Sequence, residues 1–525
     1  MKKTVEIPEE YDDAVINIAL DTISLKKQAL VFVNTKRAAE SQAERIAHKI
    51  KEQKTEWEEM AEASLKALSR PTKQCQRLAV CLKKGIAFHH AGLASKQREL
   101  VEDSFRNGNI KIICCTPTLA LGLSLPSFRT IVRDLKRYGG PWGMHPIPVL
   151  EYHQMIGRSG RPDFKDEYGE GICIASTKGE ADSIIEHYIN GEPEEIYSKL
   201  AVEPVLRTYV LSLIASEFVT TEQDLKEFFD KTFYAHQFKD LSKLHAIIDK
   251  MLRLLEEWEF ITRENNDKDF ASADELGKGS LKATLVGHRV AELYLDPATA
   301  FFIITCLRRA TQKLLSEFSF IQMASSCNEM RPLLSMRVAD YDVVQEKALQ
   351  YSDSILELEP SEFSEEYEEF LKSVKTAMFF QDWINEKDEE YLLETYNIRP
   401  GEIRVKLELA DWLLYSSEEL AKLLSFHPLI KEIVKMRFRL KHGAKEELLP
   451  LLKLKDIGRV RSRIMFKNGI RTITDVKNAE YTKLAYLLGK QVALSVKKQV
   501  GQDLTPEKIE IKTNKRKGQK NIKDF

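Results

Sequence analysis

The sequence lacks any long hydrophobic run. Its apolar stretches are short and interrupted, residues 298–307 being among the longest, whereas a membrane-spanning helix needs about 20 consecutive apolar residues. The first residues, MKKTVEIPEEYDD, turn acidic at once and contain no signal-peptide core. These absences argue against a membrane protein, and we expect a cytoplasmic chain without a membrane partner.

Cysteine and net charge are also limited. The seven cysteines are scattered, odd in number and form no C-x-x-C pair, so the sequence predicts neither a disulfide framework nor a metal site and fits a reducing compartment. The net charge is only −1, which excludes a global basic field. A nucleic-acid partner would therefore have to be held by local patches of charge.

The chain does have length. Its 525 residues exceed the roughly 250–300 at which single cores stop growing, and they predict about three or four domains. Within residues 1–197 strand-like and helix-like segments alternate, which predicts a parallel sheet covered by helices. The expected strands are 28–34, 85–88, 110–116, 130–133 and 171–175.

After Gly191-Glu192-Pro193 the pattern changes to almost pure helix. Three helical segments and a short β-wing favour a winged helix, with 280–294 expected to be helical. Long helical patterns follow, then a small helical unit and a basic tail with no core. The expected domains are 1–197 (α/β), 198–296 (winged helix), 297–442 (all-helical), 443–510 (small helical) and 511–525 (tail).

The most specific motif is QMIGRSGRP, residues 154–162. Arg158 and Arg161 are three residues apart, so on a helix they share one face. Gly157 and Gly160 remove side chains beside them, which predicts room for the close approach of a ligand. A lone R-x-x-R is more often a pair of surface arginines, so the interpretation depends on further motifs.

A second motif, CTPTLALGLSLP at 115–126, follows an apolar strand-like segment. It would lie at the carboxyl end of a strand, the edge where α/β sheets bind ligands. Thr116 and Thr118 offer hydroxyl groups there, and Gly122 offers a bare backbone. These are the groups that a phosphate contact needs.

Two more segments add polar and basic residues. FHHAGLASKQRELVEDSF at 88–105 places His90 and Gly92 before a basic helix, where they can border a groove for a sugar-phosphate backbone, although histidines taken alone are more often packing or surface residues. VFVNTKRAAE at 31–40 is a strand running into a basic helix start. Its candidate nucleic-acid contacts are Asn34, Lys36 and Arg37.

In order, these four motifs resemble the second RecA-like domain of superfamily-two helicases, and most closely the archaeal Hjm-type DNA helicases, relatives of the polymerase-theta helicase domain. EPVLRTYVLSLIAS and LVGHRVAELYLDPATA resemble that family's winged helix, and MRPLLSMRVADYD, FLKSVKTAMFFQDWI and LELADWLLY resemble its helical domain. The resemblance covers nearly the whole chain. It implies a RecA-like domain, a winged helix, an all-α ratchet domain and a helix–hairpin–helix domain.

The resemblance also implies roles. Arg158 and Arg161 would reach the γ-phosphate of ATP, and arginine fingers of this kind are worth about 10³–10⁵ in rate. Gln154 and Gly122 would also contact the nucleotide. The implied cofactors are ATP and Mg²⁺, held mainly by the first motor domain, and the implied partner is forked or single-stranded DNA. The residues that would hold its phosphates are Thr116, His90 and Gly92.

Between these motifs the segment RYGGPWGMHP contains turn signals at Gly139-Gly140-Pro141 and at Gly143. An ordinary loop would explain them. The family places a strand-separating β-hairpin here, so the resemblance implies that Tyr138, Trp142 and Met144 lie near its tip and wedge against the last base pair.

The sequence has no G-x-x-x-x-G-K-[ST] motif and no acidic motif after one, and such a motor needs both to hold ATP and Mg²⁺. The segment Gly277-Lys278-Gly279-Ser280 has the wrong spacing and no preceding strand. Either a split gene encodes the first motor domain as a separate subunit, or the chain is a fragment of a longer protein. In both cases we expect no ATPase activity from this chain alone.

A helix expected at about 402–424 carries Arg404, Lys406 and Trp412. In the family a long helix here acts as a ratchet, with a basic and an aromatic side chain on unpaired bases, and such stacking is worth about 1–3 kcal/mol per base. The alternative is that Trp412 belongs to the core. Which of Arg404 and Lys406 is the basic contact stays open.

Residues 454–469, LKDIGRVRSRIMFKNG, resemble a helix–hairpin–helix. The turn ending at Gly458 would present backbone amides to a phosphate at a helix N-terminus, with Arg459 and Arg461 beside it. Asp456 stands where glycine is usual. Aspartate tolerates a positive φ better than most residues, but its charge would repel a phosphate.

In the tail, Gln519, Ile522 and Phe525 have the spacing of a sliding-clamp-binding peptide without its final aromatic, and a random basic tail gives the same spacing. Three interpretations of the whole chain remain: part of a 3′–5′ DNA helicase for fork repair, a non-catalytic DNA-binding or regulatory module, and part of an RNA-directed helicase. The helix–hairpin–helix favours DNA over RNA.

Overall fold

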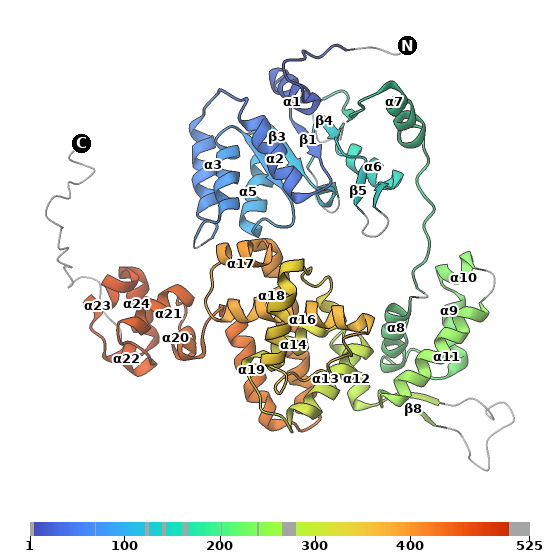
Figure 1. Cartoon of the computed structure of the whole chain (residues 1–525), viewed down its shortest axis with the longest axis vertical. Coiled ribbons are helices and arrows are strands. Elements are labelled where there is room, and N and C mark those ends of the chain that lie inside the picture. The colour runs from blue at the N-terminus through green and yellow to red at the C-terminus, as the bar shows by residue number, and fades with distance from the viewer. Residues whose placement is uncertain are drawn as a thin grey trace. The chain divides into compact units, whose positions relative to one another are not determined.

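The chain folds into two bodies in the computed structural model (Figure 1). The described residues are 5–68, 70–120, 125–138, 143–160, 166–200, 202–238, 241–264 and 280–502. The first body takes in residues up to 200 together with 230–240 and 388–406, and the second takes in the rest. The first body is thus assembled from three separate stretches of sequence.

A five-stranded parallel sheet in the order β2-β3-β1-β4-β7 forms the centre of the first body. All five expected strands form, with only their ends shifted. Four are fully buried, and their sequences are mostly apolar, as expected of parallel strands covered on both faces. The strands are β1 (Ala29–Phe32), β2 (Ile86–His89), β3 (Ile112–Cys115), β4 (Arg129–Val132) and β7 (Glu170–Cys173).

Helices pack against this sheet. The predicted helix after β1 forms as α2, and Thr35 caps it by accepting a hydrogen bond from the Ala38 amide at 3.0 Å. The helices of this body are α1 (Ala14–Ser24), α2 (Lys36–Ala47), α3 (Thr55–Leu65), α4 (Lys73–Leu82), α5 (Ser95–Arg106), η1 (Pro117–Ala120), α6 (Val149–Ile156), α7 (Lys178–Ile184), the π-helix η3 (Ile185–Ile189), α10 (Phe233–Gln237) and α17 (Glu389–Tyr396).

The strand register aligns the carboxyl ends of the sheet. Cys115 lies opposite both Phe32 and His89, and Val132 lies opposite both Phe32 and Cys173. The segments that follow β1, β2, β3 and β4 therefore leave the sheet at one edge. A short antiparallel hairpin of β5 (Lys136–Tyr138) and β6 (Met144–Pro146) follows β4.

The second body begins with a winged-helix arrangement. Its elements are α8 (Glu203–Ala215), α9 (Glu222–Asp230), α11 (Ser242–Glu257), β8 (Ile261–Glu264), β9 (Ser280–Ala283) and α12 (Leu285–Glu292). The expected helix at 280–294 is wrong at its start, because Ser280–Ala283 pairs with β8 as a strand and buries Leu281. Helix α12 begins only after Thr284, whose hydroxyl accepts from the Gly287 amide at 3.0 Å.

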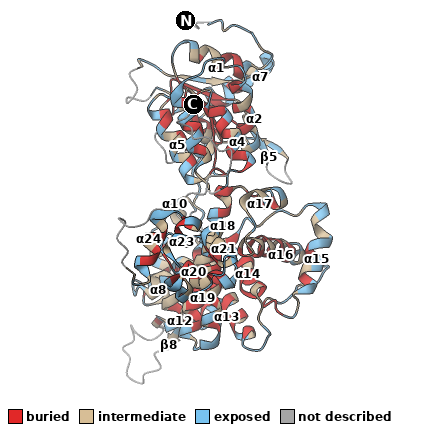
Figure 2. Cartoon of the chain, turned by 90° about the vertical axis from the view of Figure 1, so that its left-hand side faces the viewer, coloured by how far each residue is buried: buried red, intermediate tan, exposed pale blue. Residues whose placement is uncertain are grey.

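The rest of the second body is helical, as predicted, and Figure 2 shows its buried positions in red. Its elements are α13 (Pro297–Ala310), α14 (Glu317–Ser326), α15 (Tyr341–Gln350), α16 (Glu365–Ile384), α18 (Pro400–Leu423), α19 (His427–His442), α20 (Leu449–Leu452), α21 (Arg459–Lys467), α22 (Ile473–Asn478), α23 (Tyr481–Leu488) and α24 (Lys490–Gln499), with short 3₁₀ turns η4 (Asn328–Met330), η5 (Val338–Asp340) and η6 (Glu446–Leu448). The start of α18, up to residue 406, counts with the first body.

Among the described residues no single helix is long and apolar enough to cross a membrane, and one bent pair, α12 with α13, passes that test by length and composition only.

Candidate nucleic-acid interface

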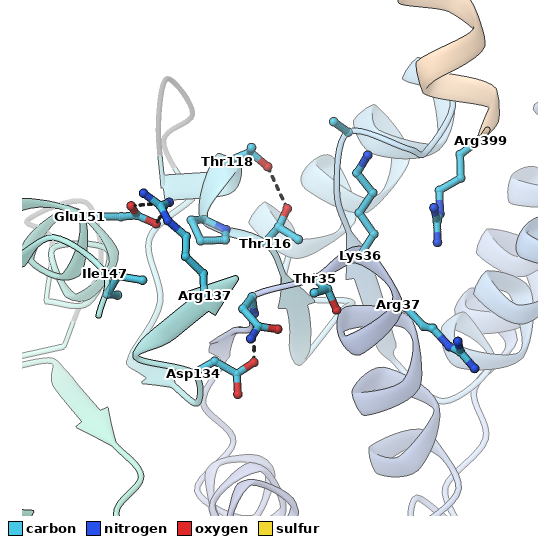
Figure 3. Close-up of a pocket in the computed structure, with 13 residues that line it drawn as sticks. Thr35, Lys36, Arg37, Thr116, Thr118, Asp134, Arg137, Ile147, Glu151 and Arg399 are labelled. Atoms are coloured by element: carbon cyan, nitrogen blue, oxygen red, sulfur yellow. Dashed lines mark hydrogen bonds and ion pairs between the residues drawn. The ribbon is translucent and has the colours of Figure 1, made fainter. Parts of the chain in front are cut away.

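A groove of about 540 Å³ lies at the carboxyl edge of the sheet in the first body (Figure 3). The segments after β1, β2 and β3 contribute to it, together with the β5–β6 hairpin, α6 and the residue before α18. Motif segments that are far apart in the sequence thus meet at one edge, as the strand order predicts. The predicted contacts that line the groove are Asn34, Lys36, Arg37, Thr116 and Thr118.

The threonine pair forms one polar wall of the groove. The hydroxyl oxygens of Thr116 and Thr118 are 2.9 Å apart and hydrogen-bonded (Figure 3). Thr116 is buried whereas Thr118 is exposed. Thr118 can therefore offer a hydroxyl to a phosphate, while Thr116 supports it from below.

Basic side chains line the groove, but carboxylates pair with most of them. Lys36 pairs with Glu402 at the start of α18, and Arg137 pairs with Glu151 at 2.8 Å. Arg37 is exposed and has no ion-pair partner among the described residues. Arg37 is thus the cation best placed to meet a phosphate without first breaking an internal contact.

Arg399 also lines the groove, and sequence reasoning missed it. It comes from the segment before α18, and its Nε donates to Glu40 of α2 at 3.4 Å. No local motif marks this residue. Its place depends on a contact between residues 359 positions apart in the chain.

His90 does not face the groove, in contrast to the prediction. It is fully buried (0% exposed). Its Nδ1 accepts from the Gly92 amide at 3.1 Å, so Nε2 carries the proton and donates to Glu40 at 3.2 Å. Burial lowers the pKa of His90, which keeps the ring neutral at neutral pH. The residue supports the loop after β2 and cannot touch a phosphate in this arrangement.

Glu40 is the acidic centre beneath this loop. Burial by itself raises the pKa of the carboxyl group, but hydrogen bonds from His90 and Gln74 and the charges of Arg399 and Arg77 outweigh it and lower the pKa to about 2. The carboxylate is therefore ionised at any physiological pH. It holds α2, α4 and the loop after β2 together with the segment before α18.

Gly92 serves packing rather than phosphate contact. Its carbonyl accepts from the Gly401 amide at 3.1 Å, and an added Cβ would overlap the Arg399 side chain. A Cβ on Gly401 would in turn overlap the carbonyl oxygens of Ala91 and Leu93. The two glycines allow the start of α18 to lie directly on the loop after β2.

Residues 154–160 of the motif at 154–162 lie on α6 and the turn after it. Gln154 is half-buried, and Arg158 is only 6% exposed because its guanidinium donates to the carbonyl of Ala120. Arg161 and Gly122 lie outside the described residues. The Arg158 guanidinium thus lies at the end of η1, where the Ala120 carbonyl holds it.

The glycines of this motif make room for backbone rather than for a ligand. Gly160 has a φ of +70°, which favours glycine, and its Cα faces Gly169 so closely that neither residue could carry a side chain without a shift. The Ser127 amide donates to the Arg158 carbonyl at 2.9 Å. The motif is thus fixed beside the start of β4.

The predicted β-hairpin forms. Tyr138 pairs with Met144 in antiparallel register, and their side chains are 73% and 57% exposed. Trp142 lies outside the described residues. At the base of the hairpin, the Asn34 side-chain amide donates to the Lys136 carbonyl at 3.2 Å. The Asn34 backbone amide donates to the Asp134 carboxylate at 3.0 Å. Asn34 therefore ties the end of β1 to the hairpin.

On α18 the predicted contacts differ in exposure. Arg404 is exposed, and Lys406 is partly buried, which lowers its pKa. Trp412 is half-buried, and its indole N–H donates to the Leu293 carbonyl at 3.2 Å. This bond fastens the indole edge of Trp412 to the residue after α12, and the side chain remains partly exposed.

The turn before α21 has the predicted backbone but different side-chain partners. Asp456 adopts a φ of +66°, and Gly458 is open to solvent on its Cβ side. Arg459 lies over the Trp383 ring at 4.4 Å and donates to the Lys387 carbonyl, and Arg461 donates to the Asp456 carbonyl at 2.7 Å. Arg459 thus contacts the end of α16 and the residues after it, whereas Arg461 is exposed and contacts its own turn. Gln519, Ile522 and Phe525 lie outside the described residues.

Comparison with known proteins agrees with this domain order. Residues 55–163 match the family described as helicase conserved C-terminal domain, residues 169–262 match a helix-turn-helix domain, and residues 318–443 match archaeal helicase, domain 4. The three matches follow one another along both bodies.

Curated relatives match nearly the whole chain. ATP-dependent DNA helicases Hel308 are 39% identical over 95% of this chain in Methanocella arvoryzae, 37% over 94% in Methanococcus vannielii and 36% over 93% in Pyrococcus horikoshii. The matched parts cover 66%, 68% and 66% of those relatives, so the chain spans about two thirds of their length. By this identity, over this length, the chain belongs to the Hel308 family of archaeal helicases.

Proposed function

We propose that the chain supplies the second motor domain and the DNA-handling domains of an ATP-dependent DNA helicase that unwinds forked DNA 3′ to 5′ in fork repair. The observation that carries this proposal is the groove at the carboxyl edge of the sheet, where Arg37 and Thr118 are accessible. A single-stranded backbone would follow this groove, and the exposed hairpin residues Tyr138 and Met144 would meet the last base pair.

ATP and Mg²⁺ would be held mainly by a first motor domain. From this chain, Gln154, Arg158 and Arg161 would face the bound ATP. Hydrolysis of ATP would supply the free energy for unwinding. Arg158 donates to the Ala120 carbonyl in the structure, so its contact with a nucleotide requires this hydrogen bond to be exchanged. Because the sequence has no phosphate-binding loop, we expect no turnover by the chain alone.

An ATPase assay tests this function. The chain would be assayed with single-stranded DNA, alone and after mixing with the part of the Methanocella arvoryzae relative that it does not match. We expect turnover and fork unwinding only in the mixture, and Arg161→Ala should abolish that turnover while leaving DNA binding intact. Turnover by the pure chain, or a mixture as inactive as its parts, would contradict the proposal.

A second candidate is a DNA-binding module without catalysis, favoured by the missing phosphate-binding loop. Fork binding by the chain alone, with no turnover in any mixture, would support it. The spacing of Gln519, Ile522 and Phe525 further suggests that a sliding clamp binds the tail. Clamp capture that is unchanged after deletion of residues 522–525 would end that idea.

A further inference from the structure

A tyrosine outside every motif closes the base of the β5–β6 hairpin. Tyr188 lies in the π-helix η3 and is 4% exposed. Its hydroxyl lies 3.1 Å from the carbonyl oxygen of Leu135 and 3.0 Å from that of Ile147. The hydroxyl has one proton, so it donates to one of these two carbonyls at a time. Leu135 precedes β5 and Ile147 follows β6, so this hydroxyl contacts both strands of the hairpin where they leave the body.

The same segment holds α6, the helix on which the motif at 154–162 begins. The Tyr188 ring packs on Tyr152 of α6 with 5.2 Å between centroids. Six residues later, the Glu194 carboxylate accepts from the amides of Val149 at 2.6 Å and Leu150 at 3.1 Å. These amides have no partner inside α6, so Glu194 acts as its N-terminal cap.

A third contact joins the hairpin to α6 directly. Arg137 of β5 donates to both carboxylate oxygens of Glu151 on α6, at 2.8 and 3.2 Å (Figure 3). Tyr188 lies within a single turn of π-helix, in which the Asn190 amide donates to the Ile185 carbonyl. Such turns often occur at functional sites.

We propose that Tyr188, Glu194 and the Arg137–Glu151 pair are positioning residues that fix the hairpin to α6, so that the hairpin moves as one piece with the helix that carries Gln154. The meaning of that movement rests on the proposed function, in which the hairpin separates strands and α6 faces the nucleotide. Tyr188 is buried and cannot touch DNA, so any effect of its hydroxyl on DNA must pass through the hairpin.

Tyr188→Phe removes only the hydroxyl, and Tyr294→Phe, at an exposed tyrosine, is the matched control. Amide hydrogen exchange of the chain alone should be faster at residues 144–147 in Tyr188→Phe and unchanged in β1. With a fork that carries 2-aminopurine at the last base pair, saturating wild-type chain should raise the fluorescence. Tyr188→Phe should bind this fork within about twofold of wild type but give at most about half the rise.

The outcomes separate the two proposals. Unchanged exchange at residues 144–147, or faster exchange with the full fluorescence rise per bound chain, would overturn the positioning role. Wild-type chain that binds no fork would refute the proposed function, and the exchange measurement would still decide whether the Tyr188 hydroxyl holds the hairpin. Equal losses in both tyrosine variants would also count against the proposal.

Discussion

The carboxyl edge of the sheet and the turn before α21 both carry arginines beside glycine-containing turns, yet the two regions use them differently. At the sheet edge Arg37 is exposed without an ion-pair partner among the described residues. On α21, directly after the turn, Arg459 lies over Trp383, and Arg463 pairs with Glu386 and Glu447. The first region keeps a cation available to a ligand, and the second uses its cations to hold helices together.

This difference shows that a basic residue near a motif is ambiguous until its partners are known. An exposed cation costs the fold little when it is removed, because surface ion pairs contribute about 0–1 kcal/mol. Removal of a cation that pairs with buried or half-buried carboxylates lowers the free energy of unfolding more, because a carboxylate is left without a partner. Substitutions can therefore separate binding residues from structural residues in this chain.

The largest expected effect is at the acid beneath the sheet edge. Glu40→Gln removes a buried charge that His90, Arg77 and Arg399 contact. Since the folded pKa is about 2, against an ordinary value of 4.5, the ionised group should contribute of order 3 kcal/mol to stability at pH 7. Urea unfolding at pH 7 should show a loss of roughly this size in the variant.

The pH dependence of that loss checks its cause. A carboxyl group whose folded pKa is depressed contributes stability above its unfolded pKa, and this stability is lost as the pH falls toward the folded pKa. The difference in free energy of unfolding between wild type and Glu40→Gln should therefore shrink as the pH falls from about 4.5 to about 2. A gap that stays constant to pH 3 would show that packing, not charge, accounts for the loss.

Arg463→Met, on α21, should have the next largest effect. The variant keeps an apolar stem but leaves Glu386 and Glu447 without their guanidinium partner. We expect the free energy of unfolding to fall by about 1–2 kcal/mol, with fork affinity per folded molecule unchanged. Thermal unfolding and fluorescence anisotropy measure the two quantities, and a loss of affinity without a loss of stability would reverse the comparison.

Arg37→Gln should give the opposite pattern. Loss of one phosphate contact should weaken single-strand binding about 3–10-fold at low salt and reduce the slope of log affinity against log salt by about 0.7. Stability should stay within about 0.5 kcal/mol. Arg106→Gln is the control. Arg106 ends α5, which runs from the carboxyl edge of the sheet back to the edge where the strands begin, so this arginine lies away from the groove. Equal losses in both variants would deny the groove a role.

The smallest expected effect is at Glu402. Glu402→Gln keeps an acceptor for the Arg399 amide, now 2.9 Å from the carboxylate, but removes the negative charge that pairs with Lys36. Single-strand affinity should rise about twofold at low salt, because Lys36 becomes available to a phosphate. The titrations would be made at about 50 mM salt or below. If the variant's affinity for single-stranded DNA is unchanged or lower there, Lys36 does not contact the DNA backbone.

The sequence was sufficient to predict what depends on chain order. Parallel strands end at one edge, so the meeting of Asn34, Thr116 and Thr118 followed from the strand pattern. The positive φ of Asp456 agrees with the turn that the helix–hairpin–helix resemblance implies, in which glycine is usual at this position. What failed depended on distant partners: the burial of His90 requires Glu40, and the position of Arg459 requires Trp383. No local pattern encodes such pairs, because they form only when the helices pack.

The late return of residues 388–406 to the first body has a consequence for synthesis. Gly401 donates to Gly92, and Arg399 reaches Glu40, so the edge of the sheet is completed by residues made long after its last strand. At about 5–20 residues per second on the ribosome, this edge of the sheet lacks its covering segment for roughly 10–40 s. During this interval the carboxylate of Glu40 lacks one of its cations, and the loop at Gly92 lacks the start of α18 that later covers it.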